Sequence, residues 1–239
     1  DFILGAISLQ TEKFDADLLL ELWPEQFGTS ARKWLSMRGN GGEFRNAKLR
    51  AFAEIPSFKS SILSFQLPLK KARIAGISGS WGWHDFNFTW KEESPRIRSV
   101  NLEARIFENH LSMEILDAKM PNLKMKTGQI ELFPVLGYGN SSVKRAVEID
   151  VTIDGSIPAF IELLNDPTIN KLPVEIKKLT NPNGTIIAKI ATVSELQHKK
   201  LKLNSISGVA SLASASFENL PLKETLSDGK IELTLEKNG

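Results

Sequence analysis

Cysteine is absent from the 239 residues of the chain, and neither sign of charge is in large excess. Without cysteine there are no disulfide frameworks, thiolate metal sites or cysteine nucleophiles. The 30 basic side chains stand against 28 acidic ones, which gives a formal net charge of +2. No run of five or more like charges occurs either. The sequence therefore offers no electrostatic argument for binding nucleic acid or for a polybasic membrane arm.

Long hydrophobic runs are also lacking. No segment approaches the roughly 18 consecutive apolar residues that suggest a membrane-spanning helix. The chain begins at Asp1 without the charged start and apolar run of a signal peptide. We therefore expect a piece of a longer protein whose membrane anchor lies outside these residues. Its composition, 41% hydrophobic and 24% charged, is that of an ordinary globular domain able to bury a core.

Sequence motifs for catalysis or metal binding are missing as well. The chain contains no HExxH, no Walker loop and no GxSxG. Its three histidines, His84, His110 and His198, are far apart in sequence and lie near predicted turns or strand ends. In a strand, His84 and the adjacent Asp85 point to opposite faces, which disfavours a catalytic pair. We expect no catalysis, no cofactor and no metal.

From Ala47 onward, short segments alternate between apolar and polar residues. The clearest run is Val100 to Ile106, followed by a predicted turn at residues 108–110 and a returning run from Leu111 to Ile115. The same alternation recurs at residues 123–126, 130–132, 147–153, 201–203 and 231–235. It is typical of an antiparallel sheet with one buried face, so we predict a mainly β protein.

Three short helices are predicted, near residues 15–23, 29–38 and 158–165. Trp23-Pro24 ends the first, because proline restricts the residue before it. Thr29 or Ser30 can begin the second as an N-cap, and Pro158 suits the first turn of the third. The first two helices form a hairpin at one end of the sheet. The side chains expected to be buried there are Leu22, Trp23, Trp34 and Leu35.

Several connecting segments are also predicted. Phe2 to Leu9 is expected to form a strand, and residues 12–15 to turn into the first helix. Residues 174–179 are expected to form a short helix or an edge strand, and residues 181–184 a turn.

Aromatic side chains are densest between Trp81 and Trp90. In an unbroken strand, Trp81 and Trp83 share one face. Phe86 and Phe88 also share a face with each other, and Trp90 would lie on that face too. An aromatic core, a belt at the level of lipid headgroups and a sugar-stacking platform are the three interpretations of this cluster.

The predicted strands present more apolar surface than three short helices can cover. A second sheet in a closed β-sandwich, closure into a barrel, or an apolar ligand held in a curled open sheet would each cover it. The residues alone leave these three possibilities open.

The stretch from residue 22 to 49 contains Trp-Pro, a short gap, Ala-Arg-Lys-Trp-Leu at 31–35, Gly-Gly at 41–42 and Asn-Ala-Lys-Leu at 46–49. This string resembles the opening of the conserved domain of the YhdP-type AsmA-like proteins, which are large bacterial envelope proteins. Residues 155–169, 183–190, 205–217 and 226–233 are similar to later parts of that domain, so the likeness covers most of residues 12–235. Ser194-Glu195-Leu196 replaces the usual proline-leucine, and residues 52–78 match poorly.

The resemblance implies a strongly curved antiparallel sheet that forms an open apolar groove, as in bridge-like lipid-transfer proteins. Residues 1–239 would be a single AsmA-like segment, with its helical hairpin at about residues 15–38. It would belong to the periplasmic part of a protein anchored in the inner membrane, which helps to move phospholipid between the inner and outer membranes. Phospholipid acyl chains would be its partner. The residues expected to line the lipid groove are Leu102, Ala104, Ile106, Leu111, Met113, Ile115, Leu123, Met125, Ile130 and Leu132.

Two other functions remain as alternatives. One is a structural or protein-interaction module of the bacterial envelope, built as a closed β-sandwich. The more remote one is a glycan hydrolase that uses Trp83 and Glu92.

Overall fold

The computed structural model describes residues 2–22, 29–56, 73–89, 96–134, 145–165, 180–197, 200–218 and 226–238. The strands are β1 (Phe2–Asp15), β2 (Gly39–Asn40), β3 (Glu43–Pro56), β4 (Arg73–Phe88), β5 (Ile97–Phe107), β6 (His110–Met120), β7 (Leu123–Phe133), β8 (Arg145–Ser156), β9 (Thr180–Gln197), β10 (Lys200–Glu218) and β11 (Leu226–Asn238). The helices are α1 (Ala16–Leu22), α2 (Thr29–Arg38) and α3 (Ile157–Leu164).

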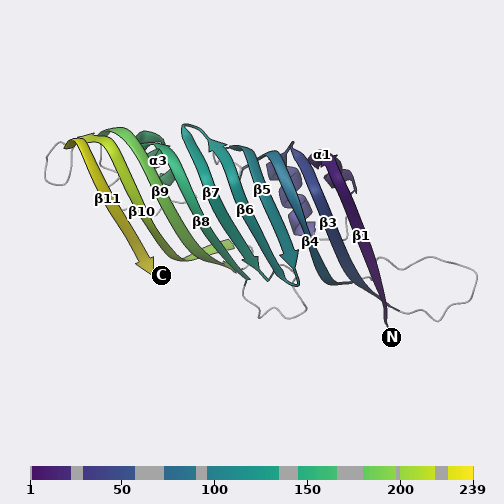
Figure 1. Cartoon of the computed structure of the whole chain (residues 1–239). Coiled ribbons are helices and arrows are strands. Elements are labelled where there is room, and N and C mark those ends of the chain that lie inside the picture. Colours follow the sequence, from purple (N-terminus) through teal and green to yellow (C-terminus); the bar gives the residue numbers. More distant parts are fainter. Residues whose placement is uncertain are drawn as a thin grey trace, which may run out of the picture.

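All of these strands belong to one sheet. The long strands pair in the order β1-β3-β4-β5-β6-β7-β8-β9-β10-β11, each antiparallel to the next, and the short β2 pairs with β4. Figure 1 shows them side by side in a single curved layer, from β1 in purple to β11 in yellow. The first and last strands do not pair, so the sheet is open. The predicted mainly β fold with a curved antiparallel sheet is confirmed, and the described strands form neither a closed sandwich nor a barrel.

The three predicted helices are present within about a residue of their expected bounds. Asp15 caps α1, because its Oδ1 accepts a hydrogen bond from the Asp17 backbone N–H at 2.8 Å. Ser156 caps α3, with a proline in the first turn as predicted. Leu35 in α2 is buried, as expected. Trp23 lies outside the described residues, as do the side chains of Leu22 and Trp34.

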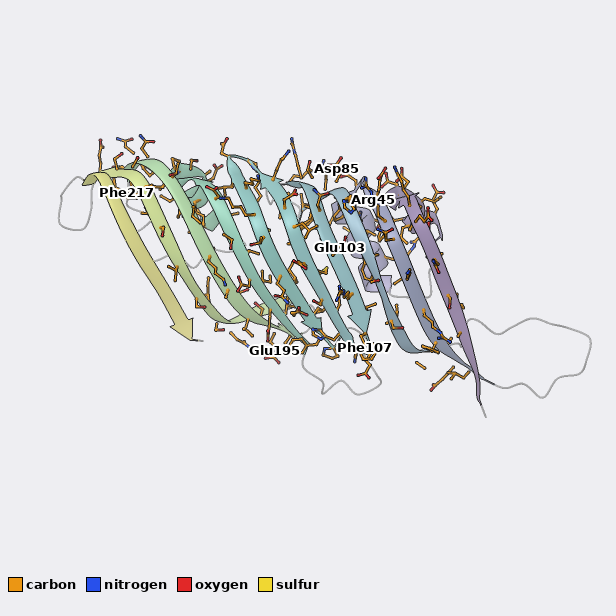
Figure 2. The ribbon with its side chains drawn as sticks, in the orientation of Figure 1. Arg45, Asp85, Glu103, Phe107, Glu195 and Phe217 are labelled. Atoms are coloured by element: carbon orange, nitrogen blue, oxygen red, sulfur yellow. The ribbon has the colours of Figure 1, made fainter. Side chains whose placement is uncertain are left out.

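All three helices lie at one end of the sheet, here called the helix end. Helix α1 follows the last residue of β1, α2 precedes the start of β3, and α3 follows the last residue of β8. The opposite end, where a two-residue turn joins β5 to β6, is called the hairpin end. In Figure 2, Asp85 and Phe217 lie near the helix end, and Phe107 and Glu195 lie near the hairpin end.

Three boundaries differ from the sequence prediction. Residues 12–15 continue β1 instead of turning, and His110 opens β6 by pairing with Phe107. Residues 181–184, predicted as a turn, begin β9. Asn181 and Gly184 do have the positive φ angles of turn residues, 49° and 108°, but they bend a strand whose pairing with β10 is irregular there. Residues 174–179 lie outside the described part.

The core lies on one face of the sheet, here called the apolar face. Its buried side chains form one cluster with Leu35 of α2 and with Ile157, Phe160 and Leu163 of α3. Figure 1 shows α2 and α3 behind the sheet. The helices therefore cover the apolar face near the helix end, and the opposite face carries the polar residues of each strand.

Candidate functional site

All ten residues predicted to line a groove lie on the apolar face of β5, β6 and β7. Directly opposite residues of an antiparallel pair share a face. The register places Leu102 opposite Ile115, and Ala104 opposite Met113, which in turn lies opposite Ile130. The other five are Ile106, Leu111, Leu123, Met125 and Leu132. The alternation in the sequence therefore assigned these ten side chains to one face, and the structure brings them together.

Their exposure divides these residues into two groups. Six are buried, with exposed fractions of 1–7%. The four partly exposed members lie together on β6 and β7, near the hairpin end. Val147 and Ile149 continue them onto β8, because they pair with Leu132 and Ile130. We call this group the open patch; its members are Leu111, Met113, Ile130, Leu132, Val147 and Ile149.

The apolar face continues well beyond the predicted residues. One row of directly opposite positions crosses nine strands, from Phe14 in β1 to Gly208 in β10. Its members are Phe14, Phe44, Trp83, Leu102, Ile115, Gly128, Val151, Ile190 and Gly208. At the usual spacing between strands, the row is about 40 Å long. For β8, the alternation of apolar and polar residues at 147–153 could have predicted that Val151 lies in this row.

At the β1 edge the apolar face is uncovered. Ile7 and Leu9 lie opposite Ala51 and Leu49 of β3 and are 62% and 44% exposed. Leu4, on the other face of β1, is 66% exposed. Large apolar side chains gathered at an open edge indicate contact with something other than water.

Aromatic rings form a continuous stack on the apolar face near the helix end. Ring centroids are 5.0 Å apart for Phe14 and Phe44, 4.6 Å for Phe44 and Trp83, and 3.7 Å for Trp83 and Phe86. Phe88 follows Phe86 at 5.7 Å. Phe44 and Phe86 are only 4% and 3% exposed, which favours the interpretation as an aromatic core.

Phe86 and Phe88 share a face, as expected, but it is also the face of Trp83, which an unbroken strand would not allow. The pairing of β4 with β5 shifts between Trp83 and Phe86, and Asp85 has a positive φ of 55°. A bulge adds one residue at this point, so the alternation changes phase and both phenylalanines turn to the apolar face. Trp90 lies outside the described residues.

Three nitrogen atoms in this region are buried without a hydrogen-bond partner among the described residues. They are the indole Nε1 atoms of Trp81 and Trp83 and the Nε of Arg32 in α2. All three are donors, and a buried donor without an acceptor costs about 1–3 kcal/mol. Composition and alternation gave no indication of them.

The opposite face carries a polar cluster centred on Glu131. The carboxylate accepts hydrogen bonds from Ser112 Oγ and Gln129 Nε2, both at 2.7 Å, and His110 Nε2 also contacts it. Partial burial raises the pKa of Glu131, but these three partners together outweigh burial and hold that pKa below its ordinary value. The residues come from two strands, and only the register brings them together.

This polar cluster is not arranged for nucleophilic catalysis. Ser112 and His110 each contact Glu131, whereas an activated serine needs the histidine as its own partner. Among the described residues, no three histidines or carboxylates are grouped as metal ligands. His198 and Glu92 lie outside the described part, so the proposed pair of Trp83 and Glu92 has no geometry to report.

Comparison with known proteins gives no family for this chain: no family model matches it, and neither does any curated protein or solved structure. Within the described ranges, no helix has the length and apolar character needed to cross a membrane.

Proposed function

We propose that the chain binds the acyl chains of lipids along its apolar face and catalyses no reaction. One observation carries this proposal: a single-layer sheet presents an apolar face across nine strands, and the helices of the described residues cover that face near one end. Soluble proteins rarely leave a large apolar surface in water. A partner that is apolar along its whole length fits such a surface.

The dimensions and energetics favour an acyl chain as that partner. The hydrocarbon core of a bilayer is about 30 Å thick, so a lipid chain is about 15 Å long and fits within a row of about 40 Å. Burial of each methylene contributes about 0.8 kcal/mol. Association costs at least about 4 kcal/mol, so binding requires chains with several buried methylenes, and chain length should set the affinity.

We further propose that this binding serves the movement of phospholipid between the inner and outer membranes, in the periplasmic part of a membrane-anchored bacterial protein. The resemblance to AsmA-like proteins supports this proposal. The openness of the sheet is consistent with it, because a chain on an open face can enter and leave without unfolding the protein.

One observation favours a second candidate, a protein-interaction module of the envelope. The β1 edge exposes its backbone ladder together with Leu4, Ile7 and Leu9. An extended segment of another protein can add a strand at such an edge. This function uses the edge and not the open patch, so the two candidates make different contacts.

Photolabelling with a fatty acid that carries a diazirine near its methyl end distinguishes the two candidates. Lipid binding predicts labelled peptides from β6, β7 and β8, with the modified residues in the open patch, and competition by unlabelled fatty acid. The polar residues of the same strands, such as Glu114 and Lys124, provide the internal control. Labelling that is equal on both faces, or that resists competition, would show that the apolar face does not bind acyl chains.

A further inference from the structure

Helix α2 and strand β4, which meet at the aromatic stack, carry the three buried donors that lack a partner among the described residues. We call the place where they meet the corner. Leu35 of α2 and Phe86 of β4 meet at Gly39: a Cβ atom there would lie 2.5 Å from Phe86 Cζ and 2.9 Å from Leu35 Cδ1. Trp83 stacks on Phe86 with 3.7 Å between ring centroids. Helix α2 is thus held directly over the part of the apolar face that carries Trp83.

The three donors lie on the two elements that make this contact. Arg32 precedes Leu35 by three residues, so the two side chains share one face of α2. Trp81 precedes Trp83 by two residues in β4, so both indoles lie on the apolar face, about 7 Å apart along the strand. The Nε atoms of Arg32 and of both indoles have almost no accessible surface and no partner.

The charge in this corner is also unbalanced. The guanidinium of Arg32 donates from Nη2 to the Leu20 carbonyl oxygen at 3.1 Å, which satisfies one N–H and leaves the positive charge. Among the described residues, no carboxylate pairs with it. Asp17, the carboxylate in the first turn of α1, is exposed and accepts instead from the Gly41 backbone N–H. A cation and two N–H donors without an acceptor are complementary to an anionic oxygen group.

We propose that this corner binds the anionic end of an acyl lipid, with Arg32 as its ion-pair partner and the indoles of Trp81 and Trp83 as hydrogen-bond donors. The inference rests on the proposed function, because the acyl chain of the same molecule lies on the apolar face. The oxygens enter beneath α2, and the chain extends from Trp81 along its row, through Ala104 and Met113, toward the open patch. The ligand is therefore oriented with its polar end under α2 and its methyl end toward the hairpin end.

Binding titrations of the chain with hexadecanoate and with hexadecanol test this proposal. The two probes have the same chain length, and only the first carries an anionic oxygen group. The wild type should bind hexadecanoate at least about tenfold more tightly than hexadecanol, which is the preference expected of hydrogen bonds to a charged group. Acetate, an anion without a chain, should not compete. The substitution Arg32→Met should remove the preference and leave hexadecanol binding unchanged.

Lys33→Met provides the matched control, because the adjacent lysine carries the same charge and is exposed. It should keep the preference. If Arg32→Met and Lys33→Met lose the preference for hexadecanoate to the same extent, the preference reflects general charge attraction and the proposal is overturned. Equal affinity of the wild type for both probes would also overturn it while leaving acyl-chain binding intact. If neither probe binds, the proposed function itself fails.

Indole N–H resonances provide a readout that does not depend on the stability of the arginine variant. In ¹H–¹⁵N spectra of the wild type, Trp81→Phe and Trp83→Phe assign the two signals. Hexadecanoate should move both signals downfield, because each proton gains an anionic acceptor, and hexadecanol should move them much less. If hexadecanoate binds and neither signal moves, the headgroup lies elsewhere and the proposal is wrong.

Discussion

Trp83 and Phe86 are three residues apart in one strand, yet their rings stack on the same face with centroids 3.7 Å apart. Strict alternation would place them on opposite faces. The bulge between them joins the two halves of the aromatic cluster into a single stack that continues across β1, β3 and β4. Helix α2 packs on this stack, so the phase change in β4 determines where the helical hairpin covers the sheet.

The stack should contribute strongly to stability. Phe86 is 3% exposed, and its replacement by alanine leaves a cavity between Trp83 and Leu35. We expect Phe86→Ala to lower the free energy of unfolding by about 3–5 kcal/mol, measured by urea denaturation. Phe107→Ala is the control, because Phe107 is 69% exposed and its loss should change stability by less than about 0.5 kcal/mol. Equal effects of the two substitutions would mean that the stack is not part of the core.

The helical hairpin should be firmly attached to the sheet, not a loose flap. Leu35 is 6% exposed and joins the main core cluster, whereas Met37 in the same helix is 59% exposed. Leu35→Ala should therefore lower the free energy of unfolding by about 2–5 kcal/mol, and Met37→Ala should hardly change it. Thermal unfolding followed by circular dichroism measures both. An unchanged melting curve for Leu35→Ala would show that α2 does not pack on the sheet.

The Glu131 cluster makes part of the stability dependent on pH. The folded-state pKa of Glu131 lies below its ordinary value of 4.5, so its stabilising contribution is present above pH 4.5 and is lost as pH falls through the folded pKa. At pH 7, Glu131→Gln should cost on the order of 1 kcal/mol. The wild type and this variant should converge in stability as the pH falls through the folded pKa.

Glu114→Gln is the control for this titration, because Glu114 is exposed on the neighbouring strand, also on the polar face. The free energy of unfolding of Glu114→Gln should stay close to that of the wild type at every pH. If the gap between wild type and Glu131→Gln widens as the pH falls, the sign of the pKa shift is wrong.

Much of the fold follows from local patterns in the sequence. Alternation from Val100 to Ile115 predicted the hairpin of β5 and β6 and the face that each residue occupies. Pro158 predicted the first turn of α3, as the preference of proline for that position requires. Such signals depend on a residue's immediate neighbours, so a single sequence contains them.

The features that sequence patterns missed depend on the register or on an irregularity within a strand. A bulge needs one additional residue, and nothing in His84-Asp85 marks it. Asn181 and Gly184 carry turn chemistry, but the pairing with β10 keeps them in a strand. The three unpaired donors come from α2 and β4, and only the packing of the helix on the sheet brings these two elements together. That packing is a tertiary relationship, which alternation and capping preferences do not contain.

The central claim, that the apolar face binds acyl chains, is tested most directly by mass spectrometry of lipid extracted from three purified proteins. They are the wild type, Met113→Glu and Thr127→Glu. Met113 lies in the open patch and is partly exposed, so a carboxylate there should remain hydrated and the protein should fold. Thr127 is exposed on β7 near the paired Lys126 and Asp154, and serves as the control. We expect lipid in the wild type and in Thr127→Glu, and a folded Met113→Glu without it. Absence of lipid from all three, or as much lipid in folded Met113→Glu as in the wild type, would contradict the claim.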